Sequence, residues 1–154
     1  MNKNVTIKGG VVMYGLFNAK RRATRDLNLD FVKYSLADEP IKNFLDTLNL
    51  VDDGIKVYID GDIKELHHQD YKGKRVNIVL KEENNFNFSI KLNIGVHKNF
   101  DIKQEKYCFN LEAINESVTF TVNSKEQIIR EKLKSLLRFD IRTTRYKDIF
   151  VFII

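Results

Sequence analysis

The chain has 154 residues, of which 43% are hydrophobic and 31% are charged, a balance that predicts one folded domain with a real core and argues against disorder. No apolar run approaches the roughly 20 residues of a membrane span, and no secretory leader opens the chain, so we expect a cytoplasmic protein with no membrane partner. Cys108 is the single cysteine, so we expect no internal disulfide. The formal net charge of +5 permits a polyanionic partner, such as a nucleotide or RNA, without requiring one.

The first third of the chain alternates predicted strands with predicted helices. Residues 5–7 predict a short strand, Gly9 and Gly10 a turn, and residues 11–17 a helix. Residues 26–31 alternate between apolar and polar side chains, which predicts a half-buried strand. A second helix is expected over residues 35–49, with Asp38 as its cap and Pro40 in its first turn.

The rest of the chain is dominated by a period of two. Strands are expected over residues 55–59, 75–80, 86–96 and 118–122. Ser124 and Gln127 have the spacing of a capping box, which predicts a helix ending near Phe139. That helix is expected to bury five apolar side chains, Ile128, Ile129, Leu133, Leu136 and Leu137. Residues 144–154 suit a final helix or a final strand. The order of elements predicts the α+β class, with helices packed on a mixed sheet, in a single domain over residues 1–154.

Three features of the sequence could carry chemistry. Gly9 and Gly10 lie between a strand and a helix, where backbone N–H groups can approach a phosphate. One strand face carries Asp26, Asn28 and Asp30, whose side-chain oxygens could hold a hard cation such as Mg²⁺. A cluster of charged residues near the C-terminus could bind a triphosphate. It consists of Glu131, Lys132, Arg142, Arg145, Lys147 and Asp148. Taken singly, each feature has a plainer explanation as a turn, a solvated strand face or a solvated helix face.

Two smaller candidates are better explained as structural. His67, His68 and Asp70 could form the nucleus of a metal site, but paired histidines in a loop are usually only polar. Cys108 stands between Tyr107 and Phe109, a context that predicts a buried thiol in a packed strand rather than a nucleophile.

Taken in order, the glycine pair, the following helix and the strand with Asp26 resemble the layout of polymerase-β-type nucleotidyltransferases. The whole chain resembles one branch of them, the AbiEii/AbiGii abortive-infection toxins of type IV toxin–antitoxin systems. The segments that carry this resemblance are residues 8–10, 22–28, 91–95, 126–127, 131–133 and 145–150.

The resemblance implies an enzyme that moves a nucleoside monophosphate from an NTP to an acceptor hydroxyl. RNA, notably tRNA, is the implied acceptor, and a cognate antitoxin is an implied partner. Three carboxylates would hold two Mg²⁺ ions, and this chain carries Asp26, Asn28 and Asn93 at their positions. Lys132 would contact the nucleotide as part of the catalytic set. The other implied nucleotide-binding residues are Lys8, Gly9, Gly10, Arg22, Thr24, Arg145 and Asp148.

The departures from the family pattern weaken the implied metal site. Asn28 and Asn93 replace two carboxylates with neutral amides, which ligate Mg²⁺ weakly and cannot accept the hydroxyl proton. Asp30, on the same strand face about 7 Å from Asn28, could supply one replacement ligand. Val151 stands where the family has an aspartate, and the family's helical lead-in and C-terminal extension are not found in these 154 residues.

Two hypotheses of different classes follow. In the first, the chain is a working nucleotidyltransferase toxin with a relaxed metal site built from Asp26 and Asp30. In the second, it is a non-catalytic member that at most binds nucleotide or RNA. Because positioned charge supplies most of the catalysis in phosphoryl transfer, the two amides favour the second hypothesis.

Overall fold

The structure is a computed structural model that describes residues 5–16, 26–32, 35–66, 73–82, 86–97, 102–111 and 115–139. Over these residues the chain forms three helices and eight strands. In chain order they are β1 (Val5–Lys8), α1 (Gly10–Leu16), β2 (Asp26–Val32), α2 (Asp38–Leu48), β3 (Ile55–Ile59), β4 (Lys64–Leu66), β5 (Gly73–Glu82), β6 (Asn87–His97), β7 (Gln104–Leu111), β8 (Glu116–Asn123) and α3 (Lys125–Phe139).

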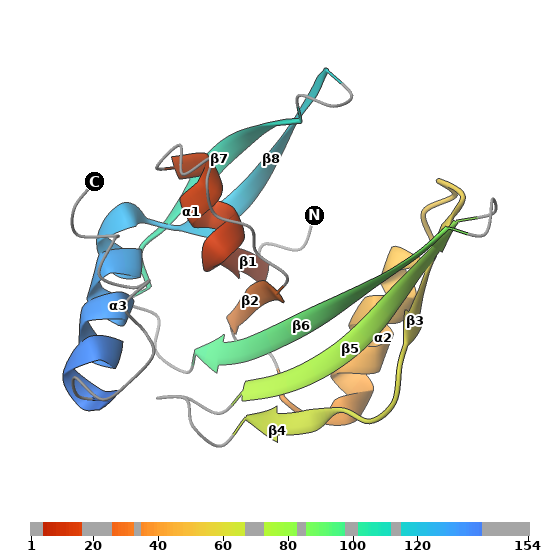
Figure 1. Cartoon of the computed structure of the whole chain (residues 1–154), viewed down its shortest axis with the longest axis horizontal. Coiled ribbons are helices and arrows are strands. Elements are labelled where there is room, and N and C mark those ends of the chain that lie inside the picture. The colour runs from red at the N-terminus through yellow and green to blue at the C-terminus, as the bar shows by residue number, and fades with distance from the viewer. Residues whose placement is uncertain are drawn as a thin grey trace.

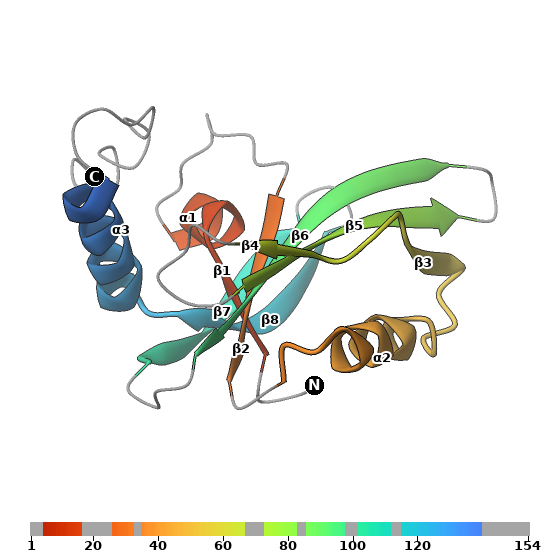
Figure 2. The same cartoon turned by 90° about the horizontal axis from the view of Figure 1, so that it is seen from below.

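All eight strands belong to one mixed sheet, in the order β3-β5-β6-β2-β1-β8-β7, with β4 also paired to β5. The pairs β2·β6 and β1·β8 are parallel, whereas the other strand pairs are antiparallel. Helices α2 and α3 lie toward opposite ends of this sheet, and the long strands β5 and β6 form its extended arm (Figures 1 and 2). The expected α+β class, with helices on a mixed sheet, is therefore confirmed.

The core consists of two apolar clusters. The larger one packs Ile41 and Leu45 of α2 against the apolar side chains of β2, β5 and β6, including Phe31, which is fully buried. The smaller one joins α1, β8 and α3 through Val12, Met13, Val122 and Ile128. The predicted alternation is therefore confirmed for β2 and β6. Leu29 and Phe31 of β2 and Leu92 and Ile94 of β6 lie on the buried, apolar face of the sheet.

Helix α2 begins three residues later than the sequence predicts. Ala37 is its N-cap and has an extended backbone, with no side-chain cap. The predicted cap, Asp38, lies inside the first turn, and its carboxylate pairs with Lys74 of β5. A tertiary ion pair has therefore replaced the local capping bond. Pro40 does occupy the first turn, as predicted.

Helix α3 confirms the predicted capping residue, since Ser124 Oγ accepts a hydrogen bond from the backbone N–H of Gln127, at 3.3 Å. Hydrogen bonds from backbone N–H and from Ser124 also lower the pKa of the Glu126 carboxyl in the first turn. The expected apolar face is only partly correct. Ile128 is buried, but Leu133 and Leu137 are 47% and 77% exposed. The apolar contacts of the smaller cluster involve the first turns of α3 and do not reach these two leucines.

Two further predictions about side-chain burial are wrong. Cys108 is exposed, because Tyr107 and Phe109 pack edge-to-face on one side of β7 and alternation turns the cysteine to the other side. Asp30 is fully buried, so the polar face of β2 is not solvated along its whole length.

Several predictions fall outside the described residues and stay predictions. They concern Arg22, Thr24, His67, His68, Asp70, Arg142, Arg145, Lys147, Asp148 and residues 144–154. Among the described helices, none has the length and apolar character required to cross a membrane.

Candidate nucleotide site

A single row of polar residues crosses five neighbouring strands of the sheet. The register pairs Lys64 of β4 with Arg75 of β5, Arg75 with Asn93 of β6, Asn93 with Asn28 of β2, and Asn28 with Lys8 of β1. Residues paired in this way point to the same face of a sheet. Asn28 and Asn93, which the resemblance implies stand at metal-ligand positions, are therefore direct neighbours on the sheet.

The two asparagines are hydrogen-bonded to each other and to an arginine. Asn93 Nδ2 donates to Asn28 Oδ1 at 2.9 Å, and Asn93 Oδ1 accepts from Arg75 Nε at 2.8 Å. Two carboxylates could not form the first bond, since neither would carry a donor proton when ionised. The two amides thus form a hydrogen bond with each other, and the Arg75 guanidinium adds a positive charge beside them.

Gly9 closes the row at its β1 end. Its backbone has φ = +78°, and a β-carbon at this position would lie 2.7 Å from Asn28 Nδ2. Glycine adopts this conformation without steric cost and leaves room for the amide. The glycine that the sequence suggested as a phosphate contact therefore also has a packing role beside Asn28.

We expect Gly9→Ala to lower the free energy of unfolding by about 2–3 kcal/mol, from the left-handed backbone and the loss of the Asn28–Asn93 bond. Gly61→Ala is the matched control, because Gly61 has φ = +77° and nothing within 4 Å of an added β-carbon. It should cost only the backbone contribution, about 1 kcal/mol. Urea unfolding of both variants measures the difference, and equal losses would contradict the packing role of Gly9.

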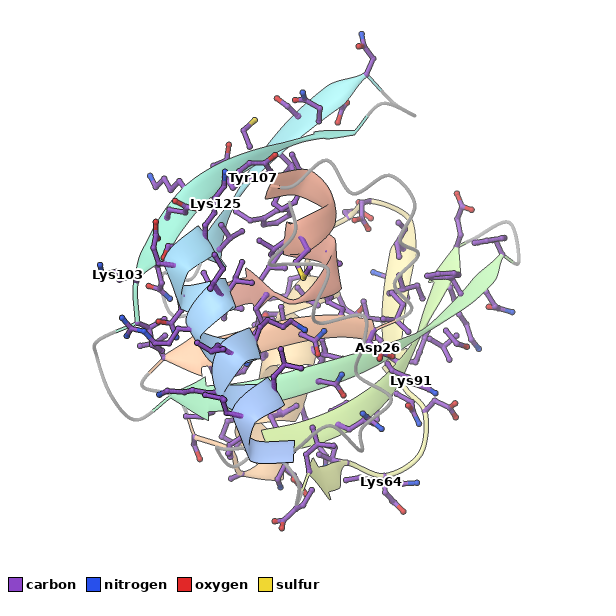
Figure 3. The ribbon with its side chains drawn as sticks, turned by 60° about the vertical axis from the view of Figure 1, so that its left-hand side comes forward. Asp26, Lys64, Lys91, Lys103, Tyr107 and Lys125 are labelled. Carbon is purple, nitrogen blue, oxygen red and sulfur yellow. The ribbon has the colours of Figure 1, made fainter. Side chains whose placement is uncertain are left out.

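Asp26 keeps its carboxylate at the start of β2. In the register it is opposite Lys91 of β6, and the two side chains lie close together in Figure 3. Lys64, at the start of β4, lies farther from Asp26 in the same view. Asp26 is partly exposed and Lys91 is exposed. The one retained carboxylate of the implied metal set is thus next to a cation.

Asp30 and Lys8 form an internal ion pair. Lys8 Nζ lies 2.5 Å from Asp30 Oδ1, and the two side chains are 11% and 0% exposed. Asn123 Nδ2 donates to Asp30 Oδ2 at 3.2 Å and lies 3.4 Å from Glu131 Oε1, so the pair is connected to β8 and α3. The resemblance implies a nucleotide contact for Lys8, and Asp30 could supply a replacement metal ligand; both roles stay predictions, and in the structure the two side chains contact each other.

The remaining implied residues are only partly placed. Lys132 follows Glu131 in α3 and is half-buried, and Gly10 begins α1. Arg22, Thr24, Arg145 and Asp148 lie outside the described residues. The structure therefore brings together Gly9, Asn28 and Asn93, and the roles of all these residues toward nucleotide or metal stay predictions.

The donor set does not suit two Mg²⁺ ions. Of the described carboxylates in the implied metal set, Asp26 lies on the strand face of the amide pair, and both amide Oδ1 atoms already accept hydrogen bonds. Asp30 is engaged by Lys8. Within the described part of the chain, no group of three or more His, Cys, Asp or Glu side chains could hold a metal ion. A hard cation needs anionic oxygen, and this row offers cations and amides instead.

Sequence reasoning missed Arg75 as a site residue. Its alternation with Val76 and Ile78 placed it on the polar face of a strand, which was the available signal. Its position opposite Asn93 depends on the β5·β6 register, and the sequence pattern does not fix that register.

Comparison with known proteins gives one family. A family model described as "Nucleotidyl transferase AbiEii toxin, Type IV TA system" matches residues 2–150, nearly the whole chain. No curated protein matches the chain.

Proposed function

The chain belongs to the AbiEii family of nucleotidyl transferase toxins of type IV toxin–antitoxin systems, and from this premise we propose that it binds a nucleoside triphosphate on the row from Lys64 to Lys8 without transferring its nucleotide efficiently. One observation carries the proposal. The two positions that should hold Mg²⁺ are amides, hydrogen-bonded to each other and to Arg75. The row therefore attracts phosphate and lacks the anionic cradle for two metal ions.

The reaction of the family explains why these amides matter. An acceptor hydroxyl oxygen attacks the α-phosphorus of the NTP, a new P–O bond forms, and pyrophosphate leaves with the bond electrons. The hydroxyl proton must pass to a base at the same time. The family resemblance assigns the base position to Asn93, and an amide does not accept a proton at neutral pH. RNA, notably tRNA, is the acceptor that we propose for any residual transfer, and a cognate antitoxin is the proposed protein partner.

A second candidate function is weak transfer that depends on Asp26. Asp26 is the retained carboxylate and is partly exposed at the start of β2. It could hold a single cation near the phosphates. This candidate differs from the first in requiring Asp26 for turnover.

One assay separates the two candidates. The purified chain is incubated with α-labelled NTPs, total RNA and Mg²⁺, and nucleotide binding is measured in parallel by calorimetry. We expect nucleotide binding without label in the RNA. Label that enters RNA and disappears in Asp26→Ala would instead establish the transferase. If none of the four common NTPs binds, the proposed function is wrong.

A further inference from the structure

Arg75 places a positive charge directly beside the amide pair. In a metal-dependent transferase, cations sit between the acidic side chains and the phosphates. Here Arg75 Nε donates to Asn93 Oδ1, so a permanent cation is fixed to the amide pair by a 2.8 Å hydrogen bond. We propose that the Arg75 guanidinium replaces the metal and that the site binds the phosphates of a nucleotide in the absence of any divalent cation. This inference rests on the nucleotide binding proposed above.

The chemistry of the guanidinium supports this assignment. Arginine stays charged at all physiological pH values and carries five N–H donors, of which the bond to Asn93 uses one. The two terminal nitrogens can donate side by side to phosphate oxygens. Arg75 is half-buried, so solvent screens its charge less than that of a surface lysine.

The neighbours of Arg75 strengthen the same charge. Lys64 is its register partner on β4, and Lys91 lies on β6 two residues before Asn93. Both lysines are exposed. Lys8, at the far end of the row, is already paired with Asp30. The cations that an anion could reach therefore lie on β4, β5 and β6: Lys64 and Arg75 belong to the row, and Lys91 lies beside it, opposite Asp26.

The amide pair also explains why Mg²⁺ should not improve binding. An Mg²⁺ ion on a triphosphate neutralises the charge that Arg75 would contact, and the protein offers the ion few anionic oxygens in return. In a site built for metal, binding tightens with Mg²⁺. Here we expect binding to be equal or weaker when Mg²⁺ is added, and to weaken with rising salt.

The test uses the full chain and each of the four common NTPs, with inorganic triphosphate as a further probe. Dissociation constants are measured by calorimetry in excess EDTA and in Mg²⁺. We expect binding in EDTA, and Arg75→Gln should weaken it about tenfold to a hundredfold, the range for hydrogen bonds to a charged group. Lys81→Gln is the matched control, with the same loss of charge on the same strand about 20 Å away, and it should leave binding unchanged.

A second variant keeps the test informative if Arg75→Gln folds poorly. Asn93→Asp retains Arg75 but places a carboxylate against its guanidinium, so the EDTA binding should fall in the same direction. If neither Arg75→Gln nor Asn93→Asp changes the dissociation constant in EDTA, the proposed role of Arg75 is wrong. Binding that appears only with Mg²⁺ would overturn the metal-independent site while nucleotide binding itself stands. No binding in either buffer would refute the proposed function as well.

Discussion

Asp30→Asn should strongly destabilise the protein, lowering the free energy of unfolding by about 3–5 kcal/mol. Asp30 is fully buried and holds Lys8 Nζ at 2.5 Å. The amide would keep the shape of the side chain but leave the lysine charge inside the protein without an anion. Thermal or urea unfolding measures the loss, and a change of this size corresponds to a fall in Tm of roughly 10 °C.

The exposed pair between Lys42 and Glu39 on α2 provides the matched control. It has the same chemistry, but its side chains are 49% and 76% exposed and its atoms are 3.6 Å apart. Because solvent screens such pairs, Glu39→Gln should cost less than about 0.5 kcal/mol. A loss of under about 1 kcal/mol for Asp30→Asn, the range of an exposed pair, would mean that Lys8 reaches solvent or another partner in the folded protein. The internal pair would then not be a structural element of this sheet.

Restoring both carboxylates should convert the site to a metal-binding one. In EDTA, the double variant Asn28→Asp with Asn93→Asp should be less stable than the native chain by about 1–3 kcal/mol. The variant loses the 2.9 Å bond between the two side chains and places like charges side by side. Adding Mg²⁺ should reverse the loss, since a ligand at about a hundred times its Kd stabilises by about 2.7 kcal/mol. The Tm of the double variant should therefore rise with Mg²⁺, whereas that of the native chain should not.

The control for this gain is a pair of exposed amides on other parts of the sheet. Asn87 lies at the start of β6 and Asn110 near the end of β7. Their double replacement by aspartate changes the net charge equally but should create no Mg²⁺ response. If the Asn28 and Asn93 double variant also fails to respond, these positions are not the metal positions of the family. If it responds, the α-label assay with RNA should show more transfer for the double variant than for the native chain.

The sequence alone was sufficient for the features that depend on local patterns. Alternation placed both ends of β2, β3, β5 and β6 to within two residues, because side chains in a strand have a strict period of two. Ser124 was recognisable as a helix cap because its bond is local. Six segments between residues 8 and 150, among them those with Gly9, Asn28 and Asn93, were sufficient to recognise the family, and the match to residues 2–150 confirms it.

The contacts of these residues were decided by the tertiary structure. Asp30 and Lys8 were both expected to contact ligands, but the antiparallel register of β1 and β2 brings them together, and burial makes pairing the favourable arrangement. Arg75 was overlooked because its neighbour Asn93 is 18 residues away and reaches it only through the β5·β6 register. A sequence fixes which side chains can bear charge or donate hydrogen bonds. Which of them neutralise one another depends on distances between strands, and folding alone sets those distances.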